Sequence, residues 1–306
     1  MGLGDPVDPQ VANGAEALVL SDGRLLEFLV DGPRDGTLLV FHHGSPGAAV
    51  RWDALSVACA QRHLRFALYS RPGFGASTRD PGRSVASCAT DVAELADHLG
   101  ARRFLTAGWS GGGPHALACA AILPERVIAV STIAAVAPWD AGGLDWFEGM
   151  GQDNKDEYSI AARDGEELLR WMEPQVRATT SIAADDIVEA LRSLISEVDE
   201  AAVNDTLGDL LARSFHAAFR YGLWGWYDDD LAFTRPWGFE LESIRAPATI
   251  WQGHHDRMVP FPHGQWLAAH VPGARPELRP EHGHLSLAVG SLGEIIEDLA
   301  APADGA

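Results

Sequence analysis

The sequence predicts an α/β fold in which a mostly parallel central sheet is flanked by helices. Short apolar runs, typical of buried strands, alternate with segments of helical spacing up to Pro138. From there to about Trp237 helical stretches follow one another without a convincing strand, and the sheet pattern then returns. We therefore expect a core of residues 1–138 and 238–306, interrupted by a helical cap of residues 139–237.

The predicted strands are short and mostly apolar. In chain order they cover residues 16–20, 24–30, 37–41, 64–69, 104–107, 127–137, 248–251 and 274–279. The predicted helices are segments in which apolar residues recur at helical spacing. They cover residues 50–62, 85–99, 113–123, 166–172, 182–198, 206–221, 261–271 and 286–299. Ser21-Asp22-Gly23 separates the first two strands and predicts a hairpin, and residues 1–15 and 300–306 are expected to be loose ends.

The composition limits the classes of function. The chain of 306 residues carries 23 basic and 43 acidic residues, a net charge of −20, which argues against nucleic acid and anionic membranes as partners. Lys155 is the only lysine, which speaks against a lysine Schiff base and a G-K-[ST] phosphate loop. Cys59, Cys88 and Cys119 are far apart and predicted to be buried, reduced thiols.

Nothing in the sequence resembles a targeting signal. The N-terminus lacks the apolar segment of a signal peptide, and no run of about 18 apolar residues occurs. We therefore expect a cytoplasmic protein whose partner is a small-molecule substrate. Its oligomeric state, monomer or homodimer, stays open.

The stretch Gly108-Trp109-Ser110-Gly111-Gly112 stands between a predicted strand and a predicted helix. A serine at such a corner adopts a strained backbone conformation, and the glycines two residues before and after it let the neighbouring backbone pass. The side-chain oxygen is then lifted clear of the sheet, near the N–H groups of the helix N-terminus, where negative charge is stabilised. This arrangement is a nucleophile elbow, although the short pattern G-x-S-x-G also occurs by chance.

An acid and a base complete the predicted catalytic set. Asp256 directly follows a strand, at the edge where open α/β sheets place function, and its carboxylate could orient an imidazole. Asp140 is the alternative acid. A histidine, either His282 or His284, follows the last strand. With a pKa near neutrality it could take a proton from Ser110 and return it to a leaving group.

Together these motifs resemble the α/β-hydrolase family with a helical cap, over about residues 15–299. The chain order of serine, aspartate and histidine is the order of that fold. The matching motifs are the oxyanion loop H-G-x-P-G at 43–47, the turn R-P-G-x-G-x-S at 71–77, the elbow at 108–112, the acid loop G-x-x-D-x-x-V-P at 253–260 and the histidine loop at 283–284. The chain departs from the family at Ser70, where an aspartate is common, but that position is not catalytic.

The resemblance implies a serine hydrolase of the esterase or proline iminopeptidase-like branch. Ser110 would be the nucleophile, Asp256 the acid and His284 the base. The backbone N–H groups of Ser45 and Gly111 would form the oxyanion hole. No metal or organic cofactor is expected. Serine at the elbow speaks against the haloalkane dehalogenases and epoxide hydrolases of this fold, which carry aspartate there.

Three other kinds of function are each opposed by a feature of the sequence. A metal site would draw on the histidine-rich corners, but no pair has an established ligand spacing. A dinucleotide site is mimicked by Gly111-x-Gly113-x-x-Ala116, but Ile133-Ala134-Ala135-Val136 stands where the acid of that motif belongs. A non-catalytic ligand receptor of the same fold would usually have lost a member of the triad.

The substrate is the least determined feature. Trp109, beside the serine, and His43 are the predicted substrate-binding residues, and the cap tryptophans either line an apolar pocket or pack the cap onto the sheet. We expect hydrolysis of small or medium apolar carboxylic esters. The alternative is an aminopeptidase of the proline iminopeptidase type, if cap carboxylates such as Asp228-Asp229-Asp230 grip a free amine; a solvated acidic loop explains them equally well. Carbon–carbon bond hydrolases and cofactor-free haloperoxidases share the triad and stay open.

Overall fold

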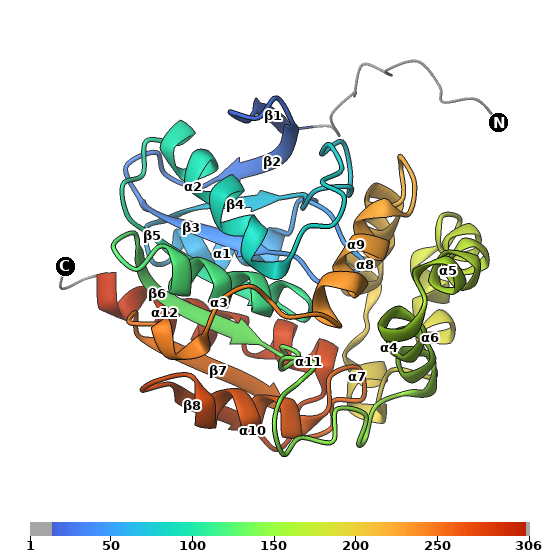
Figure 1. Ribbon diagram of the computed structural model, residues 1–306. Coiled ribbons are helices and arrows are strands. Elements are labelled where there is room, and N and C mark those ends of the chain that lie inside the picture. The colour runs from blue at the N-terminus through green and yellow to red at the C-terminus, as the bar shows by residue number, and fades with distance from the viewer. Residues whose placement is uncertain (1–13, 304–306) are drawn as a thin grey trace.

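The computed structural model describes residues 14–303, and eight strands of this part form one sheet (Figure 1). The strands are β1 (Glu16–Val19), β2 (Leu25–Asp31), β3 (Thr37–His42), β4 (Leu64–Tyr69), β5 (Phe104–Trp109), β6 (Val127–Ile133), β7 (Ala248–Gly253) and β8 (Arg275–Arg279). Their order is β1-β2-β4-β3-β5-β6-β7-β8. β2 pairs antiparallel with β1 and β4, and all other neighbours are parallel. The predicted fold class is therefore confirmed.

The register of the parallel strands aligns their carboxyl ends at one edge of the sheet. His42 at the end of β3 pairs with Tyr69 and Gly108, and Ile133 at the end of β6 pairs with Trp109 and Trp251. The loops that follow β3, β5, β6 and β7 therefore leave the sheet side by side. In open α/β sheets this edge is where ligands bind.

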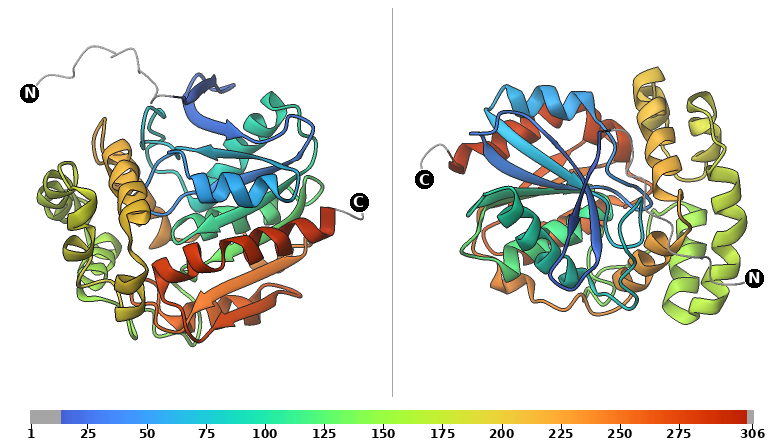
Figure 2. Two further views of the ribbon diagram at one scale, coloured as in Figure 1. Left: turned by 180° about the vertical axis from the view of Figure 1, so that it is seen from behind. Right: turned by 90° about the horizontal axis from the view of Figure 1, so that it is seen from above.

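Helices cover both faces of the sheet (Figure 2). On one face lie α1 (Asp53–Ala60) and α12 (Leu292–Ala300), and on the other lie α2 (Cys88–His98), α3 (Gly112–Ile122) and α10 (Phe261–His270). Side chains alternate between the two faces along each strand: Leu39 and Phe41 pack with the first group, and Leu38 and Val40 with the second. Outside residues 139–237, the other elements are α11 (His284–Gly290) and the short 3-10 helices at Val85–Ser87, Leu241–Ser243 and Ala301–Ala303.

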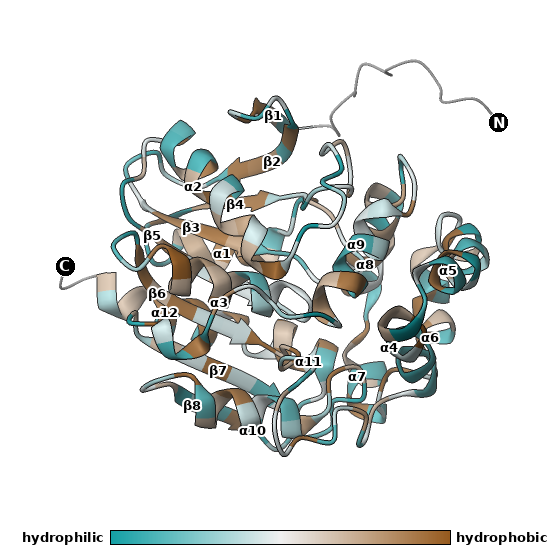
Figure 3. Ribbon diagram, in the orientation of Figure 1, coloured by the Kyte–Doolittle hydropathy of each residue, from teal (hydrophilic) through white to brown (hydrophobic). Residues whose placement is uncertain are grey.

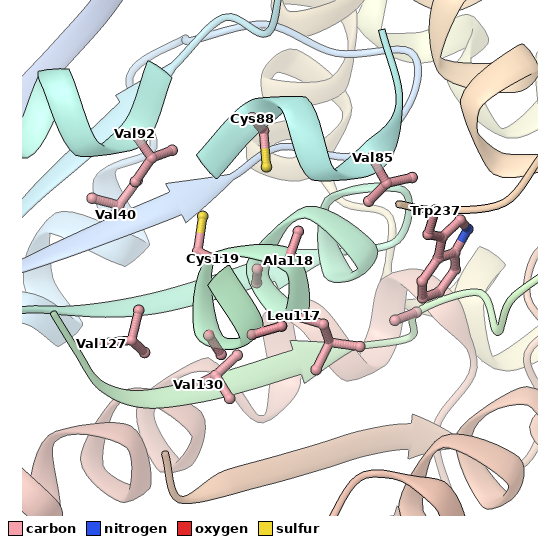
Figure 4. Close-up of a cluster of buried hydrophobic side chains, with 14 of the residues drawn as sticks. Val40, Val85, Cys88, Val92, Leu117, Ala118, Cys119, Val127, Val130 and Trp237 are labelled. Carbon is pink, nitrogen blue, oxygen red and sulfur yellow. The ribbon is translucent and has the colours of Figure 1, made fainter. Parts of the chain in front are cut away.

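The core on the α2–α3 face combines small and branched side chains with aromatic rings such as Trp237. Figure 4 shows Val40 of β3 beside Val92 of α2, with Cys88 and Cys119 between the two helices. All three cysteines are buried and unpaired, as predicted. The central strands are hydrophobic, whereas α5 (Gly165–Thr179), in the segment between β6 and β7, is mostly hydrophilic (Figure 3).

A helical segment separates β6 from β7 and lies beyond the carboxyl ends of the strands (Figure 1). Its helices are α4 (Gln152–Arg163), α5 (Gly165–Thr179), a 3-10 turn (Ala184–Asp186), α6 (Ile187–Ala190), α7 (Glu197–Ala202), α8 (Asp205–Ala218) and α9 (Trp224–Phe233). All residues between the two strands are described, and none of them is in a strand. Within the part of the chain that the structure describes, no helix is long and apolar enough to cross a membrane.

Several predicted boundaries differ from the structure. The predicted helix at 182–198 is broken into the 3-10 turn, α6 and the start of α7. The guanidinium of Arg257 donates to the carbonyls of Ser193 and Ile195, at 3.4 and 3.1 Å, which a continuous helix would have used internally. Tertiary hydrogen bonds therefore overrode helical spacing here. The strand predicted at 127–137 ends at Ile133, and the closing helix is divided into α11 and α12. Of the predicted loose ends at 1–15 and 300–306, residues 1–13 and 304–306 lie outside the described residues. The prediction was wrong for residues 300–303, which form the last residue of α12 and a short 3-10 helix.

Candidate active site

Ser110 lies at the corner between β5 and α3, in the left-handed backbone region with φ +56°. A β-carbon on Gly108 would lie 2.1 Å from the carbonyl oxygen of Gly112, and one on Gly112 would lie 2.2 Å from that of His42. Neither position therefore has room for a side chain. The Ser110 N–H donates to the carbonyl of Ile133 on the neighbouring strand at 2.8 Å, so the sheet itself holds the strained corner in place.

Asp256 and His284 are brought together from two separate loops. Asp256 follows β7 and His284 is the first residue of α11; the His284 Nδ1–H donates to Asp256 Oδ2 at 2.8 Å. The second oxygen, Oδ1, accepts from the backbone N–H groups of Met258 and Val259 at 2.9 and 2.8 Å. Gln252 also donates to Oδ2, at 3.0 Å. Both oxygens of the Asp256 carboxylate are therefore held by hydrogen bonds, and Oδ2 faces the imidazole of His284.

Burial and pairing act in opposite directions on these two groups. Burial raises the pKa of Asp256, while the charge of His284 opposes that rise. Burial by itself would lower the pKa of His284, but the charge of Asp256 and the hydrogen bond to it raise that pKa above its ordinary value. The pair therefore favours a protonated imidazole more than an isolated buried histidine would, as a base that must hold a proton requires.

The loop after β3 lies against the serine corner. A β-carbon on Gly44 would lie 3.5 Å from the β-carbon of Ser110, and one on Gly111 would lie 2.9 Å from that of Ser45. Ser45 and Gly111, the two residues predicted to supply the oxyanion hole, are thus neighbours beside Ser110.

A buried arginine holds that loop. The guanidinium of Arg71 donates to the carbonyls of His43 and Gly44 at 2.5 and 3.0 Å and to Asp229 Oδ2 at 2.7 Å. Arg83 reaches the other oxygen of Asp229 at 2.6 Å. Burial opposes ionisation of Asp229, but the two arginines hold its pKa well below the ordinary value. The loop is therefore supported by a charged network that includes α9 of the helical segment.

Ser110 and His284 both line a cavity of about 230 Å³ between the sheet edge and the helical segment. The apolar lining comes from both sides of the cavity and includes Trp52, Leu68, Trp171, Leu210, Phe215 and Trp226. Of the six tryptophans in the predicted cap, two therefore line the cavity. Others pack elsewhere: Trp139 contacts Trp146 with ring centroids 5.0 Å apart, and Trp237 belongs to the α2–α3 core.

The two predicted substrate-binding residues also line this cavity. The indole of Trp109 lies 5.9 Å from the imidazole of His284, between ring centroids. The His43 ring is held by backbone on both nitrogens: Nε2 accepts from the Arg71 N–H at 3.2 Å, and Nδ1 donates to the Gly44 carbonyl at 2.6 Å. Burial lowers the pKa of His43 well below its ordinary value. It can therefore offer a substrate the surface of a neutral ring.

The alternative acid and base lie elsewhere. Asp140 is exposed after β6, and His282 is not the histidine bonded to Asp256. His115 is buried beneath the corner, where its Nδ1 bonds the Gly111 carbonyl at 2.8 Å. Among residues 14–303, no group of three or more histidines, cysteines or carboxylates is arranged to hold a metal ion.

One interpretation of the acidic run in the predicted cap needs correction. Asp228, Asp229 and Asp230 are not in a solvated loop: they lie in α9 and are 3%, 0% and 0% exposed. Two of them also have cationic partners, since Asp228 binds Arg79 at 2.7 Å and Asp229 binds Arg71 and Arg83. The burial of this acidic helix could not be inferred locally, because its arginine partners Arg71 and Arg79 precede Asp229 and Asp228 by 158 and 149 residues.

Two acids near the site were missed by sequence reasoning. Glu157 of α4 lines the cavity and accepts from Trp226 Nε1 at 2.7 Å. Asp199 of α7 accepts the backbone N–H groups at the start of α11. Neither belongs to a motif, and both are acidic residues in helices with many exposed acids. No local signal in the sequence distinguishes them.

Comparisons with known proteins identify the family of this chain. The family described as alpha/beta hydrolase fold matches residues 37–291. A non-heme chloroperoxidase from Streptomyces lividans is 36% identical over 120 residues, which are 39% of this chain and 44% of that protein, so the alignment spans less than half of the relative. A pimeloyl-[acyl-carrier protein] methyl ester esterase from Nitrosomonas europaea is 28% identical over 82% of this chain and 89% of its own length.

A solved structure extends the likeness to nearly the whole fold. A thermophilic esterase from Thermogutta terrifontis superposes with a TM-score of 0.68, covering 95% of this chain and 98% of its own at 19% identity. At that identity the likeness concerns the fold alone. With the family match over most of its length, the strand order and the serine corner, this chain belongs to the α/β-hydrolase fold family.

Proposed function

We propose that this hydrolase is a serine esterase that cleaves carboxylic esters of small or medium apolar substrates. The observation that carries the proposal is that His284, hydrogen-bonded to Asp256, lines the same cavity as the strained Ser110. The esterase relatives named above support the same class of reaction.

The first half of the reaction forms an acyl-enzyme. His284 takes the proton of Ser110 as Oγ attacks the ester carbonyl, and Asp256 stabilises the imidazolium that results. The negative charge that develops on the carbonyl oxygen would be held by the backbone N–H groups of Ser45 and Gly111. Losing one donor of this kind typically raises the barrier by about 3 kcal/mol. The imidazolium then protonates the departing alcohol.

The second half repeats these steps with water. His284 deprotonates a water molecule that attacks the acyl carbonyl, and the proton returns to Ser110 as the acid leaves. None of these steps calls for a metal or an organic cofactor.

The size and lining of the cavity support the substrate class. Its volume of about 230 Å³ is below the roughly 300–1,000 Å³ typical of pockets for drug-sized ligands. The apolar residues on both sides would favour an aliphatic or aromatic acyl group. The aminopeptidase alternative is less well supported, because Asp228 and Asp229 already bind arginines and only Asp230 of the acidic run remains for a free amine.

The test is hydrolysis of p-nitrophenyl esters from acetate to decanoate by the wild type and by Ser110→Ala. We expect turnover by the wild type with an optimum at short to medium chains, and none above background in the variant. Ser243→Ala, outside the cavity, is the matched control and should retain wild-type rates. Equal rates for wild type and Ser110→Ala would contradict the proposal.

A further inference from the structure

The carboxylate of Asp199 lies against the N-terminus of α11, the helix that begins with the base. Its Oδ2 accepts from the backbone N–H of His284 at 2.9 Å. Its Oδ1 accepts from the N–H groups of Leu285 and Ser286, each at 2.9 Å, and from Ser286 Oγ at 3.0 Å. Asp199 is fully buried. Its carboxylate thus satisfies three of the N–H groups that the start of a helix leaves free.

The surroundings are shaped to hold this carboxylate. A β-carbon on Gly283 would lie 2.3 Å from Asp199 Oδ2, so the chain before His284 has no room for a side chain. Ser196 Oγ donates to the same oxygen at 3.1 Å. Arg257, next to Asp256, donates to carbonyls of the turn that precedes α7. The acid loop, α7 and α11 are therefore tied together around Asp199.

The placement also has an electrostatic consequence. A helix N-terminus carries a partial positive charge and disfavours a cation beside it, and His284 stands at that end of α11. The proposed reaction forms an imidazolium there. The charged groups that act on His284 are Asp256, from the loop after β7, and Asp199, from α7. Both raise the pKa of His284, against the lowering by burial.

We propose that Asp199 is a positioning residue for His284: it fixes the backbone that carries the imidazole and offsets the positive end of α11 when the imidazolium forms. This inference rests on the proposed function, because it assigns the helical segment a part in the same reaction. It goes beyond the triad, since α7 lies in a region of the chain that carries none of the recognised motifs.

The test uses Asp199→Asn, which keeps the shape of the side chain but removes its charge and one acceptor. We expect kcat/KM for the best p-nitrophenyl ester to fall by about 10- to 100-fold, as for a displacement of about 1 Å in a reacting group, with the loss in kcat rather than KM. The base works in its neutral form, and without the nearby negative charge the pKa of His284 falls. The acid limb of the kcat/KM profile should therefore move to lower pH, which a merely structural defect would not cause.

A fluorophosphonate probe separates this inference from the proposed function. The probe labels an activated serine whatever the natural substrate is. Labelling of wild type but not of Ser110→Ala, with slow labelling of Asp199→Asn and a shifted pH profile, would support both. No labelling of wild type would overturn both. Rapid labelling of Asp199→Asn with the wild-type pH profile would overturn the role of Asp199 alone.

Two further variants serve as a control and as a second test of the Asp199 contact. Asp164→Asn is the matched control, because Asp164 caps α5 through the N–H groups of Glu166 and Glu167 and lies outside the cavity lining; its labelling rate should match the wild type. If Asp199→Asn fails to fold, Gly283→Ala tests the same contact between Asp199 and the start of α11. Its methyl group must displace the carboxylate, so we expect slower labelling, and wild-type labelling by Gly283→Ala would contradict the inference.

Discussion

Two of the contacts between the helical segment and the core, those of α7 and α9, differ in chemistry. On α7, Asp199 binds backbone N–H groups at the start of α11. On α9, Asp228 and Asp229 bind arginine side chains from the β4–α2 connection. The first contact fixes the main chain of His284, the proposed base, and the second neutralises buried charges.

This difference in chemistry predicts whether each contact mainly affects stability or reaction rate. Removing a carboxylate that caps a short helix shifts the base but leaves no buried charge behind. Removing a carboxylate from a buried ion pair leaves an uncompensated cation, which is among the costlier changes in a protein. The α9 contact should therefore control stability, while the α7 contact should control rate.

The largest expected effect on stability is that of Asp229→Asn. Arg71 and Arg83 would remain buried, at 0% and 8% exposure, without their shared counter-ion. The free energy of unfolding should fall by about 3–5 kcal/mol, measured by urea denaturation. Asp205→Asn, at an exposed position of α8, is the matched control. If both variants unfold at the same urea concentration, the network on α9 does not have this role.

The next effect concerns pH. Burial raises the pKa of Glu157 to about 7 and also raises the pKa of its buried neighbour Asp230. Between pH 4.5 and about 7 the unfolded chain releases the protons of both carboxyls while the folded chain keeps them, so stability falls as pH rises. The part contributed by Glu157 is up to about 3 kcal/mol. Above about 7 the folded group also ionises and the loss levels off. Glu157→Gln, which cannot ionise, should be more stable than wild type at pH 8 and show a flatter profile. The exposed Glu148→Gln should keep the wild-type profile, and an unchanged profile in Glu157→Gln would contradict the assignment.

The smallest effect is expected for Asp228→Asn. Its partner Arg79 is 29% exposed and keeps its stacking on Trp224, with the guanidinium 3.9 Å from the ring centroid. A partly solvated cation can turn to water, so we expect a loss of about 1 kcal/mol, read as a small decrease in melting temperature. If Asp228→Asn lowered the free energy of unfolding as much as Asp229→Asn does, the solvent exposure of the arginine partner would not determine the loss of stability.

Much of the fold could be predicted because it is encoded locally. Strand and helix periods, the Ser21-Asp22-Gly23 turn and the serine corner each depend on neighbouring residues. The geometry at Ser110 illustrates this: only glycine fits at Gly108 and Gly112, since a side chain at either would strike the backbone. Asp256 and a histidine, either His282 or His284, were predicted from their places after strands. The family resemblance selected His284, which is hydrogen-bonded to Asp256.

The helical segment was harder to predict for a physical reason. Its boundaries depend on hydrogen bonds from distant residues, such as those of Arg257 that break the predicted helix at 182–198. The α9 acids looked solvated because local composition does not reveal an arginine brought there by the fold. Glu157 likewise looks like any surface glutamate of an acidic helix.

The sequence by itself determined the parallel sheet, the serine corner and the aspartate and histidine loops, because local patterns place these after β5, β7 and β8. Only the tertiary structure decided which charges are buried and what they hold: Asp229 behind the oxyanion loop and Asp199 beneath His284. A carboxylate's effect depends on its solvent exposure and its partner, and both are properties of the folded chain.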